Sequence, residues 1–346
     1  MASRRVIVAG GLGFFGGVAV ERLRALGHAP LTATRGAQAD LCLDVEHAES
    51  LRDILRAGDI VLDAVGPYQE RTTTLIEAAI EIGCDVIDIN DSLAYAERVI
   101  ALAPRIEAAG IRVLCSASSV SATAACAVRL CGVDEPVRVT GILAPATRRV
   151  VNRATALSLL RSVGRPIRVL RDGKLVPARG WGESRRFELP APLGNVRGFL
   201  FESADSVWLP RIWPSVRTAD FYIDANTPGF NALLKLAARA GFVGRCMERL
   251  LPCGAWYARR VGSRAGGLGY EIEDGSGRVV RYALLAEGNG YMGPVLPAVL
   301  AAHTLLEASF APRGLVAPDR HVDPARLADY MRSLDFTAGR LESDPY

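Results

Sequence analysis

The sequence predicts an α/β fold, in which a doubly wound parallel sheet is joined to an α+β domain with a mixed or antiparallel sheet. Before residue 132, short apolar runs alternate with helical stretches six times, as parallel strands do when helices connect them. After Pro136 the alternation gives way to hairpin signals, the clearest being Asp274-Gly-Ser-Gly277 between two strand-like runs. The 346 residues suffice for two domains.

The first domain can be followed element by element. Strand 4–9 leads into the glycine-rich turn 10–16, and a helix then runs to about residue 27. Further strands are expected at residues 31–34, 40–44, 59–64, 84–88 and 111–115. Helices are expected through residues 51–55, 72–82, 93–109 and 121–130. Because all the strands run the same way, their carboxyl ends would share one edge of the sheet, where ligands bind in such folds.

The turn after the first strand has the spacing of a dinucleotide-binding motif. Gly11, Gly13 and Gly16 satisfy GxGxxG, and the motif lies between a strand and a helix, as it must. Glycines there allow a tight turn, a close approach of backbone to pyrophosphate, and packing of helix on strand. The helix N-terminus supplies N–H donors. The alternative is a glycine-rich turn that has lost its ligand.

The end of the second strand indicates which dinucleotide binds. Enzymes that use NAD usually have an acid there for the ribose 2′-hydroxyl, whereas those that use NADP favour arginine. This sequence has Thr34-Arg35 and no acid until Asp40. We therefore expect NADP(H) to be favoured over NAD(H). The alternative is that Arg35 merely points into solvent.

Several strand ends carry motifs in an order that resembles the NADP-binding domain of the saccharopine dehydrogenase-like family. The motifs are 10–16, Arg35, Asp44, Gly66-Pro-Tyr68, Asp88-Ile-Asn-Asp91 and Ser116-Ala-Ser-Ser119. The resemblance covers residues 1–130 and weakens afterwards. It implies a Rossmann domain, an α+β second domain and a pyridine-nucleotide oxidoreductase. One departure concerns the loop at the nicotinamide end, because the family's proline after the paired serines is absent and Val120-Ser121 follow instead.

The resemblance also implies roles for particular residues. The turn through Phe14 and Phe15 would bind pyrophosphate, Arg35 the 2′-phosphate, Asp44-Val45 would border adenine, and Gly66-Pro67 would approach the nicotinamide. The candidate cofactor-binding residues are Gly10, Gly11, Leu12, Gly13, Phe14, Phe15, Thr34, Arg35, Asp44, Val45, Val65, Gly66 and Pro67.

Two side chains are candidates for moving a proton. The nicotinamide carries the hydride, so the protein has to position the substrate and handle a proton. Tyr68 follows Gly66-Pro67 and could donate one, and Asp91, near Asp88, could orient an amine or relay a proton. The alternatives are a packing ring for Tyr68 and loop capping for the aspartates.

Composition excludes other chemistry. Only Lys174 and Lys235 are lysines, so few residues could form a Schiff base with a substrate. There are four histidines, so a metal site is not expected. Residues 145–264 carry 21 basic and 8 acidic side chains, a net charge of +13. This favours a small anionic substrate, which Arg148, Arg149 and Arg153 could clamp, although a solvated arginine-rich surface is equally compatible. No nucleic-acid motif is present.

The predicted domains are a nucleotide-binding domain at 1–132, a basic α+β substrate domain at 133–292, and helices at 293–346. The family resemblance implies that these last helices return to the first domain. Segment 230–261 is basic and amphipathic. We interpret it as core-facing helices with a charged back. A roof over an apolar substrate pocket and contact with a membrane surface are the less favoured alternatives.

The leading hypothesis is an NADP(H)-dependent oxidoreductase that transfers hydride at a C–N or C–O centre of a small, anionic metabolite. The alternatives are a non-catalytic nucleotide-binding sensor and a peripheral membrane oxidoreductase acting on a lipid-like substrate. Seven cysteines without CxxC spacing indicate reduced thiols, and a chain that enters a strand at residue 4 leaves no room for a signal peptide. A cytoplasmic location is therefore expected. A homodimer is left open.

Overall fold

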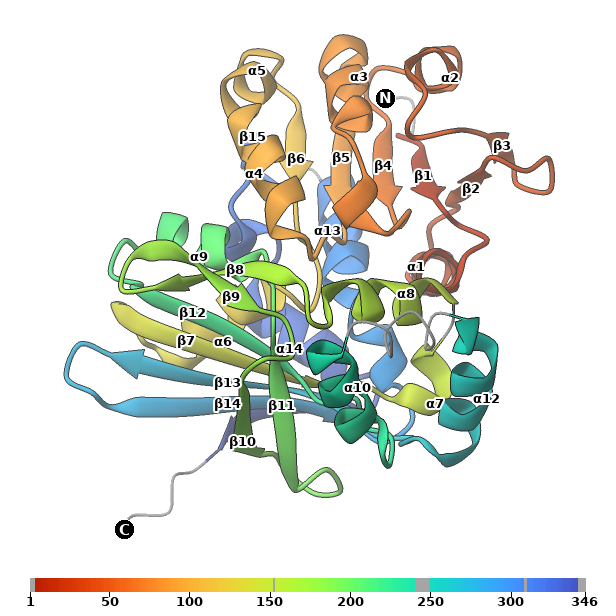
Figure 1. Ribbon diagram of the computed structural model, residues 1–346. Coiled ribbons are helices and arrows are strands. Elements are labelled where there is room, and N and C mark those ends of the chain that lie inside the picture. Colours follow the sequence, from red (N-terminus) through yellow and green to blue (C-terminus); the bar gives the residue numbers. More distant parts are fainter. Residues whose placement is uncertain (1–3, 152, 241–248, 308–309, 342–346) are drawn as a thin grey trace. The chain divides into compact units, whose positions relative to one another are not determined.

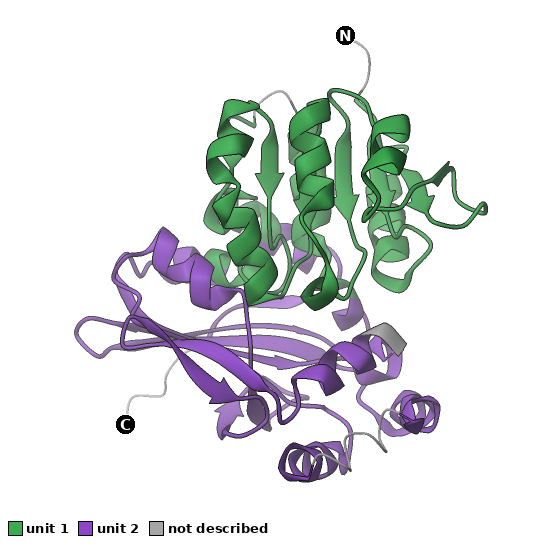
Figure 2. Ribbon diagram, turned by 45° about the horizontal axis from the view of Figure 1, so that its top comes forward, with its two compact units in different colours: residues 1–126, 292–327 green, residues 127–291, 328–346 purple. Residues whose placement is uncertain are grey.

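A computed structural model describes residues 4–151, 153–240, 249–307 and 310–341. The chain forms two compact units (Figure 2). Unit 1 contains Met1–Cys126 and Met292–Leu327, and unit 2 contains Ala127–Tyr291 and Ala328–Tyr346. This division differs from the predicted boundaries, because the last segment contributes to both units instead of returning to the first alone.

Unit 1 is built on a seven-stranded parallel sheet, in agreement with the predicted doubly wound fold (Figure 1). Its strand order is β15-β6-β5-β4-β1-β2-β3. The strands are β1 (Val6–Ala9), β2 (Leu31–Thr34), β3 (Leu41–Cys42), β4 (Ile60–Asp63), β5 (Asp85–Asp88), β6 (Arg112–Leu114) and β15 (Gly314–Leu315). β15 pairs with β6 and was not predicted, because two residues are too few to show a strand pattern.

Helices cover both faces of this sheet, as the buried parallel strands require. On one face α1 contacts α13, and on the other α2 contacts α3. The helices are α1 (Phe14–Ala25), α2 (Ala48–Ile54), α3 (Thr74–Ile82), α4 (Leu93–Ala101), α5 (Ala103–Ala108) and α13 (Leu296–Leu306), with short 3₁₀ turns η1 (Tyr68–Glu70) and η3 (Pro318–Arg320). Helix α6 (Ala122–Cys131) spans the chain boundary between the two units. The single helix predicted at 93–109 is two helices, because Pro104 occupies the first turn of α5.

Unit 2 contains a nine-stranded mixed sheet, which confirms the predicted second architecture. Its main path is β10-β11-β12-β7-β13-β14-β16, and β8 and β9 branch from β12. β12 and β7 run parallel, whereas the other pairings are antiparallel. The strands are β7 (Pro136–Ala144), β8 (Pro166–Arg171), β9 (Lys174–Arg179), β10 (Ser184–Glu188), β11 (Asn195–Phe201), β12 (Thr218–Ile223), β13 (Gly266–Asp274), β14 (Val279–Ala286) and β16 (Thr337–Leu341).

One face of the unit 2 sheet holds an apolar core that includes Ile142, Val169, Phe187, Leu200 and Tyr222. The helices of this unit are α7 (Thr147–Val150), α8 (Arg153–Ser162), α9 (Asp205–Ile212), α10 (Phe230–Arg239) and α12 (Leu251–Val261), with the 3₁₀ turn η2 (Gly290–Met292). α14 (Pro324–Arg332) precedes β16 near the end of the chain. No helix in the described ranges combines the length and apolar character needed to cross a membrane.

Candidate functional site

The sheet of unit 1 reverses its winding direction between β1 and β4. From β1 the chain moves outward to β2 and β3, and it then returns to β4 and continues to β5 and β6 on the other side. The carboxyl ends of adjacent strands with diverging connections leave a crevice where dinucleotides bind. The turn after β1 and the loop after β4, residues 64–67, both lie at this position.

Gly10, Gly13 and Gly16 of the turn after β1 each have a different structural role. Gly10 has φ +74°, which favours glycine. A Cβ on Gly16 would lie 2.1 Å from the Gly10 carbonyl oxygen, so α1 could not pack against the turn. A Cβ on Gly13 would meet only that oxygen, at 3.0 Å. Gly13 is also exposed, so the absent side chain leaves the backbone open to a ligand.

Helix α1 begins without a side chain that caps it. Gly13 is the N-cap residue, no side chain accepts a hydrogen bond from the first turn, and the first turn contains no acidic residue. The backbone N–H groups and the helix dipole therefore favour an anion at this end. Leu12, Gly13 and Phe14 are exposed at this turn, whereas Phe15 is partly buried and Gly11 is buried.

At the end of β2, Arg35 is exposed and forms no ion pair within the described chain. The next acid, Asp40, is turned back onto the strand. Its Oδ2 accepts hydrogen bonds from the Thr32 backbone N–H at 2.8 Å and from the Thr32 hydroxyl at 2.7 Å, and these bonds lower the pKa of Asp40. The Thr34 hydroxyl bonds to the backbone N–H of Gly36.

The residues predicted to border adenine follow β3. The Asp44 backbone N–H donates to the Ser50 hydroxyl, and Oδ1 of Asp44 accepts a hydrogen bond from the Glu46 N–H. Val45 is buried. The two Asp44 hydrogen bonds fix the loop before α2.

The loop after β4 rests on a buried ion-pair network. Asp63, fully buried at the end of β4, lies 3.0 Å from the Arg71 guanidinium, and Arg71 also contacts Glu46 and the Val65 carbonyl oxygen. Burial alone would lower the pKa of Arg71, but Asp63 and Glu46 hold it above its ordinary value. Arg71 therefore stays charged and anchors Val65, which precedes the cis Gly66-Pro67 peptide.

Tyr68 is buried beside this network. Its hydroxyl donates to the Asp63 carbonyl oxygen at 2.7 Å and accepts from the Ile89 backbone N–H at 3.3 Å. Burial raises the pKa of Tyr68 well above its ordinary value. Its ring packs edge-on against Tyr95. These contacts correspond to the packing-ring alternative.

A second buried polar cluster, after β5 and β6, was only partly anticipated. Oδ1 of Asp88 accepts hydrogen bonds from the backbone N–H groups of Ser116 at 2.7 Å and Asn90 at 3.0 Å, and the Asn90 amide donates to the Ser116 hydroxyl. Burial raises the pKa of Asp88 to about 7. Ser116 and Ser121 have φ of 67° and 60°, which is strained for serine. The serines were singled out from the sequence, but their backbone conformation was not predicted.

The remaining candidate residues are Asp91 and the arginines of unit 2. Asp91 is partly buried and follows the cluster of Asp88. In unit 2, Arg148 donates to the Gly262 carbonyl oxygen, and the Arg149 guanidinium stacks over the Tyr291 ring. The Arg153 side chain lies outside the described residues. The parts of the chain that the structure describes contain no cluster of ligands that could hold a metal ion.

The nucleotide-binding unit matches a known family model. Residues 6–114 match the model described as the saccharopine dehydrogenase NADP binding domain. This match confirms the predicted resemblance and supports a nicotinamide-dinucleotide-dependent oxidoreductase. A search of curated proteins found no significant match.

A solved structure shows the same fold. A saccharopine dehydrogenase (L-Glu forming) from Saccharomyces cerevisiae superposes with a TM-score of 0.66 at 14% identity, over 98% of this chain and 100% of that one. Looser matches are a meso-DAPDH mutant with DAP from Clostridium tetani (TM-score 0.40, 11% identity, 90% and 92% coverage) and the WlbA dehydrogenase from Thermus thermophilus in complex with NAD and UDP-GlcNAcA (0.39, 13%, 95% and 94%). The looser matches are too distant to support an argument.

Proposed function

We propose that this saccharopine dehydrogenase-like oxidoreductase uses NADP(H) in preference to NAD(H), and that it transfers hydride at a C–N or C–O centre of a small anionic metabolite. The observation that carries the cofactor preference is the end of β2. Arg35 is exposed there without a carboxylate partner in the described chain, while the nearest following acid, Asp40, is bound to Thr32. An arginine can bind a 2′-phosphate, whereas a carboxylate engaged with its own strand is a poor acceptor for a ribose hydroxyl.

The residues at the carboxyl edge fit such a cofactor. The uncapped start of α1 and the bare backbone at Gly13 suit a pyrophosphate, which needs N–H donors and close approach. Thr34 and Arg35 would hold the ribose phosphate. The loop through Val65 and Pro67, which Arg71 anchors, would border the nicotinamide. When bound, the nicotinamide supplies or accepts the hydride.

For the proton, Asp91 is supported over Tyr68. The Tyr68 hydroxyl is buried, and it already bonds to the Asp63 carbonyl oxygen and the Ile89 N–H. Asp91 is partly exposed at the end of the β5 loop. We propose that Asp91 contacts the substrate or a water and that Tyr68 positions the loop around it.

The charge of the middle segment supports an anionic substrate. Residues 145–264 have a net charge of +13, and such a field repels cationic amines and attracts carboxylates or phosphates. Arg148 and Arg149 make contacts within unit 2, so a substrate clamp would have to use other basic residues of this segment.

Substituting Arg35 tests the cofactor preference. Arg35→Glu removes a charge-assisted bond of about 1.5–3 kcal/mol and adds repulsion, so NADPH affinity should fall by roughly ten- to a hundredfold or more, with little change for NADH. Titration calorimetry measures both. Arg56→Glu, an exposed position in the loop before β4, makes the same charge change at the opposite edge of the sheet and should leave NADPH affinity unchanged. Unchanged NADPH binding by Arg35→Glu would contradict the assignment.

Turnover is tested separately from binding. Purified protein with NADPH and a panel of imines, ketones and aldehydes that carry carboxylate or phosphate groups should consume NADPH with at least one compound, and uncharged analogues should react more slowly. Tight NADPH binding without turnover on any compound would instead favour the non-catalytic sensor.

A further inference from the structure

Helix α10 has two apolar faces, and only one of them is covered. Leu234, Ala237 and Ala238 are buried, as expected for a core-facing helix. Leu233 and Leu236 are exposed, and Leu236 exposes 52% of its surface. The interpretation of segment 230–261 as core-facing helices with a charged back explains the first face, but it leaves the second unexplained.

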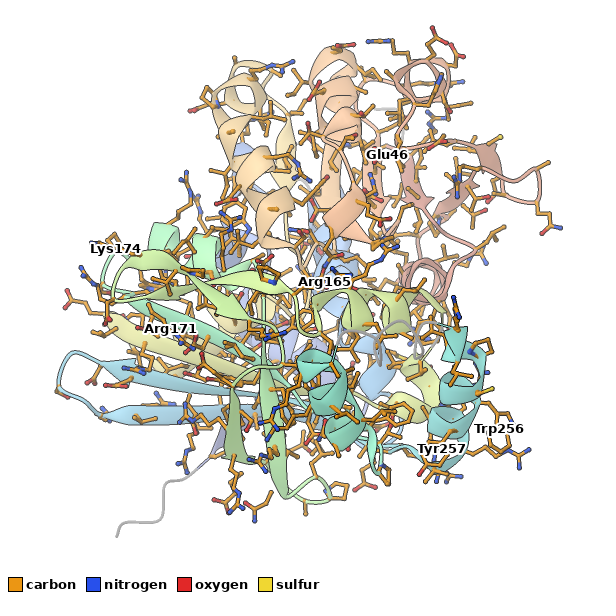
Figure 3. The ribbon with its side chains drawn as sticks, viewed as in Figure 1. Glu46, Arg165, Arg171, Lys174, Trp256 and Tyr257 are labelled. Carbon is orange, nitrogen blue, oxygen red and sulfur yellow. The ribbon has the colours of Figure 1, made fainter. Side chains whose placement is uncertain are left out.

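Helix α12 continues this exposed apolar surface. Its Trp256 exposes 56% of its surface, and Val261 and the preceding Leu250 are exposed as well. Figure 3 shows Trp256 at the outer edge of α12. The two helices pack together, because the Phe230 ring stacks on the Tyr257 ring with centroids 5.6 Å apart. Large apolar side chains that are exposed together on two adjoining helices differ from the single, scattered apolar residues of an ordinary protein surface.

Basic side chains accompany these apolar ones. Lys235 and Arg239 belong to α10, and Arg259 and Arg260 to α12. Neither helix contains an acidic residue. The Arg260 guanidinium stacks over the Trp256 ring at 5.3 Å, so the cation and the exposed aromatic share one surface. Positive charge beside exposed leucine and tryptophan is complementary to an anionic headgroup layer above acyl chains.

We propose that α10 and α12 bind the surface of an anionic lipid bilayer. Leu236 and Trp256 would enter the boundary between headgroups and acyl chains, while the arginines remain among the lipid phosphates. A second copy of this chain would satisfy the apolar side chains, but it would bring the same cations together. The charge therefore favours lipid as the occupant. This inference goes beyond the proposed cofactor and substrate, and it does not depend on them.

Vesicle binding tests the proposal with an internal reporter. Trp181, Trp208 and Trp213 are buried, so a change in tryptophan emission on membrane binding should come from Trp256. The full chain should sediment with phosphatidylcholine vesicles that contain phosphatidylglycerol, with a blue shift in emission, and much less with phosphatidylcholine alone. Trp256→Phe should abolish the shift while binding persists. The double substitution Leu236→Glu and Trp256→Glu should weaken binding at least tenfold.

Matched variants separate this surface from a general effect of charge. Leu175→Glu and Val279→Glu alter exposed apolar residues on β9 and β14 of the same unit and should bind vesicles as the parent does. All variants should keep the parent's NADPH affinity and thermal midpoint. Absence of parent binding to anionic vesicles would overturn the proposal, as would equal loss in the control variants. It would also be overturned if the double substitution converted a lipid-free dimer to monomer, because the surface would then be a self-interface.

Discussion

At the scale of single residues, Asp88 shows how the fold holds a carboxyl group. Both backbone donors, from Asn90 and Ser116, reach the same oxygen, Oδ1. Oδ2 is buried and accepts no hydrogen bond from the described residues. Burial disfavours the charged form more than the two N–H groups favour it, and the pKa therefore rises to about 7.

This arrangement predicts how stability depends on pH. Because the pKa of Asp88 is raised on folding, the protonated form stabilises the native state at low pH, and this contribution is lost as the pH rises from about 4 to about 7. Asp88→Asn cannot ionise but keeps an acceptor at Oδ1. The variant should therefore lose less stability across this range, by at most about 4 kcal/mol. Urea unfolding at several pH values measures it.

The control for this prediction is Asp53→Asn, an exposed aspartate on α2. It should leave the pH dependence of the parent unchanged. If Asp88→Asn has the same pH profile as the parent, Asp88 titrates near its ordinary pKa and the buried Oδ2 is solvated.

At the scale of elements, the sequence predicted those strands and turns that a local pattern of residues determines. Strand β2 has the predicted bounds, Leu31–Thr34, and the glycine turn has the predicted setting between strand and helix. β10 was not predicted, because four of its five residues are exposed and no apolar alternation marks it. The conformation of the Ser116 loop was not predictable either, because positive φ at serine is imposed by tertiary contacts such as the bond to Asp88.

The glycine turn supports a prediction that compares two glycine-to-alanine variants, each of which adds one methyl group at a different site. Gly13→Ala adds a Cβ on the exposed surface of the turn, where φ −78° and ψ 174° suit alanine, so the fold should persist. The added methyl would stand where backbone approaches pyrophosphate, and NADPH affinity should fall at least tenfold. Gly17→Ala adds a methyl inside α1 that meets nothing closer than 3.8 Å. It should stabilise the helix by about 0.5–1 kcal/mol without weakening NADPH binding.

Calorimetric titration and thermal unfolding of both variants measure these effects. Equal NADPH affinity for Gly13→Ala and the parent would place the pyrophosphate away from this turn. A large loss of stability in Gly13→Ala would mean that the Gly10 oxygen, 3.0 Å from the new Cβ, cannot move aside.

At the scale of the whole molecule, neither unit is a continuous stretch of chain. Helix α13 and strand β15 complete the sheet layers of unit 1, although nearly the whole of unit 2 separates them from the rest of it. The sequence predicted helices at 293–346, and the family resemblance suggested that they return to the first domain. The last strand, β16, pairs with β14 in unit 2. This partner could not be predicted from the sequence, because pairing between strands far apart in the chain leaves no local pattern.

This discontinuity yields a prediction about α13 and the distant nucleotide turn. Eight of the eleven residues of α13 are buried, and the helix contacts α1, β4 and β5. Leu300→Ala should cost about 2–5 kcal/mol through a cavity at this contact. Hydrogen exchange should accelerate first in the peptides of β1, β4 and β5, and NADPH at about a hundred times its Kd should restore about 2.7 kcal/mol of protection there. Leu200→Ala, equally buried in unit 2, should accelerate exchange first around β11 and β12, with less restoration by NADPH. If NADPH restored protection around Leu200 as strongly as around Leu300, the cofactor would stabilise both units, and binding confined to unit 1 would be refuted.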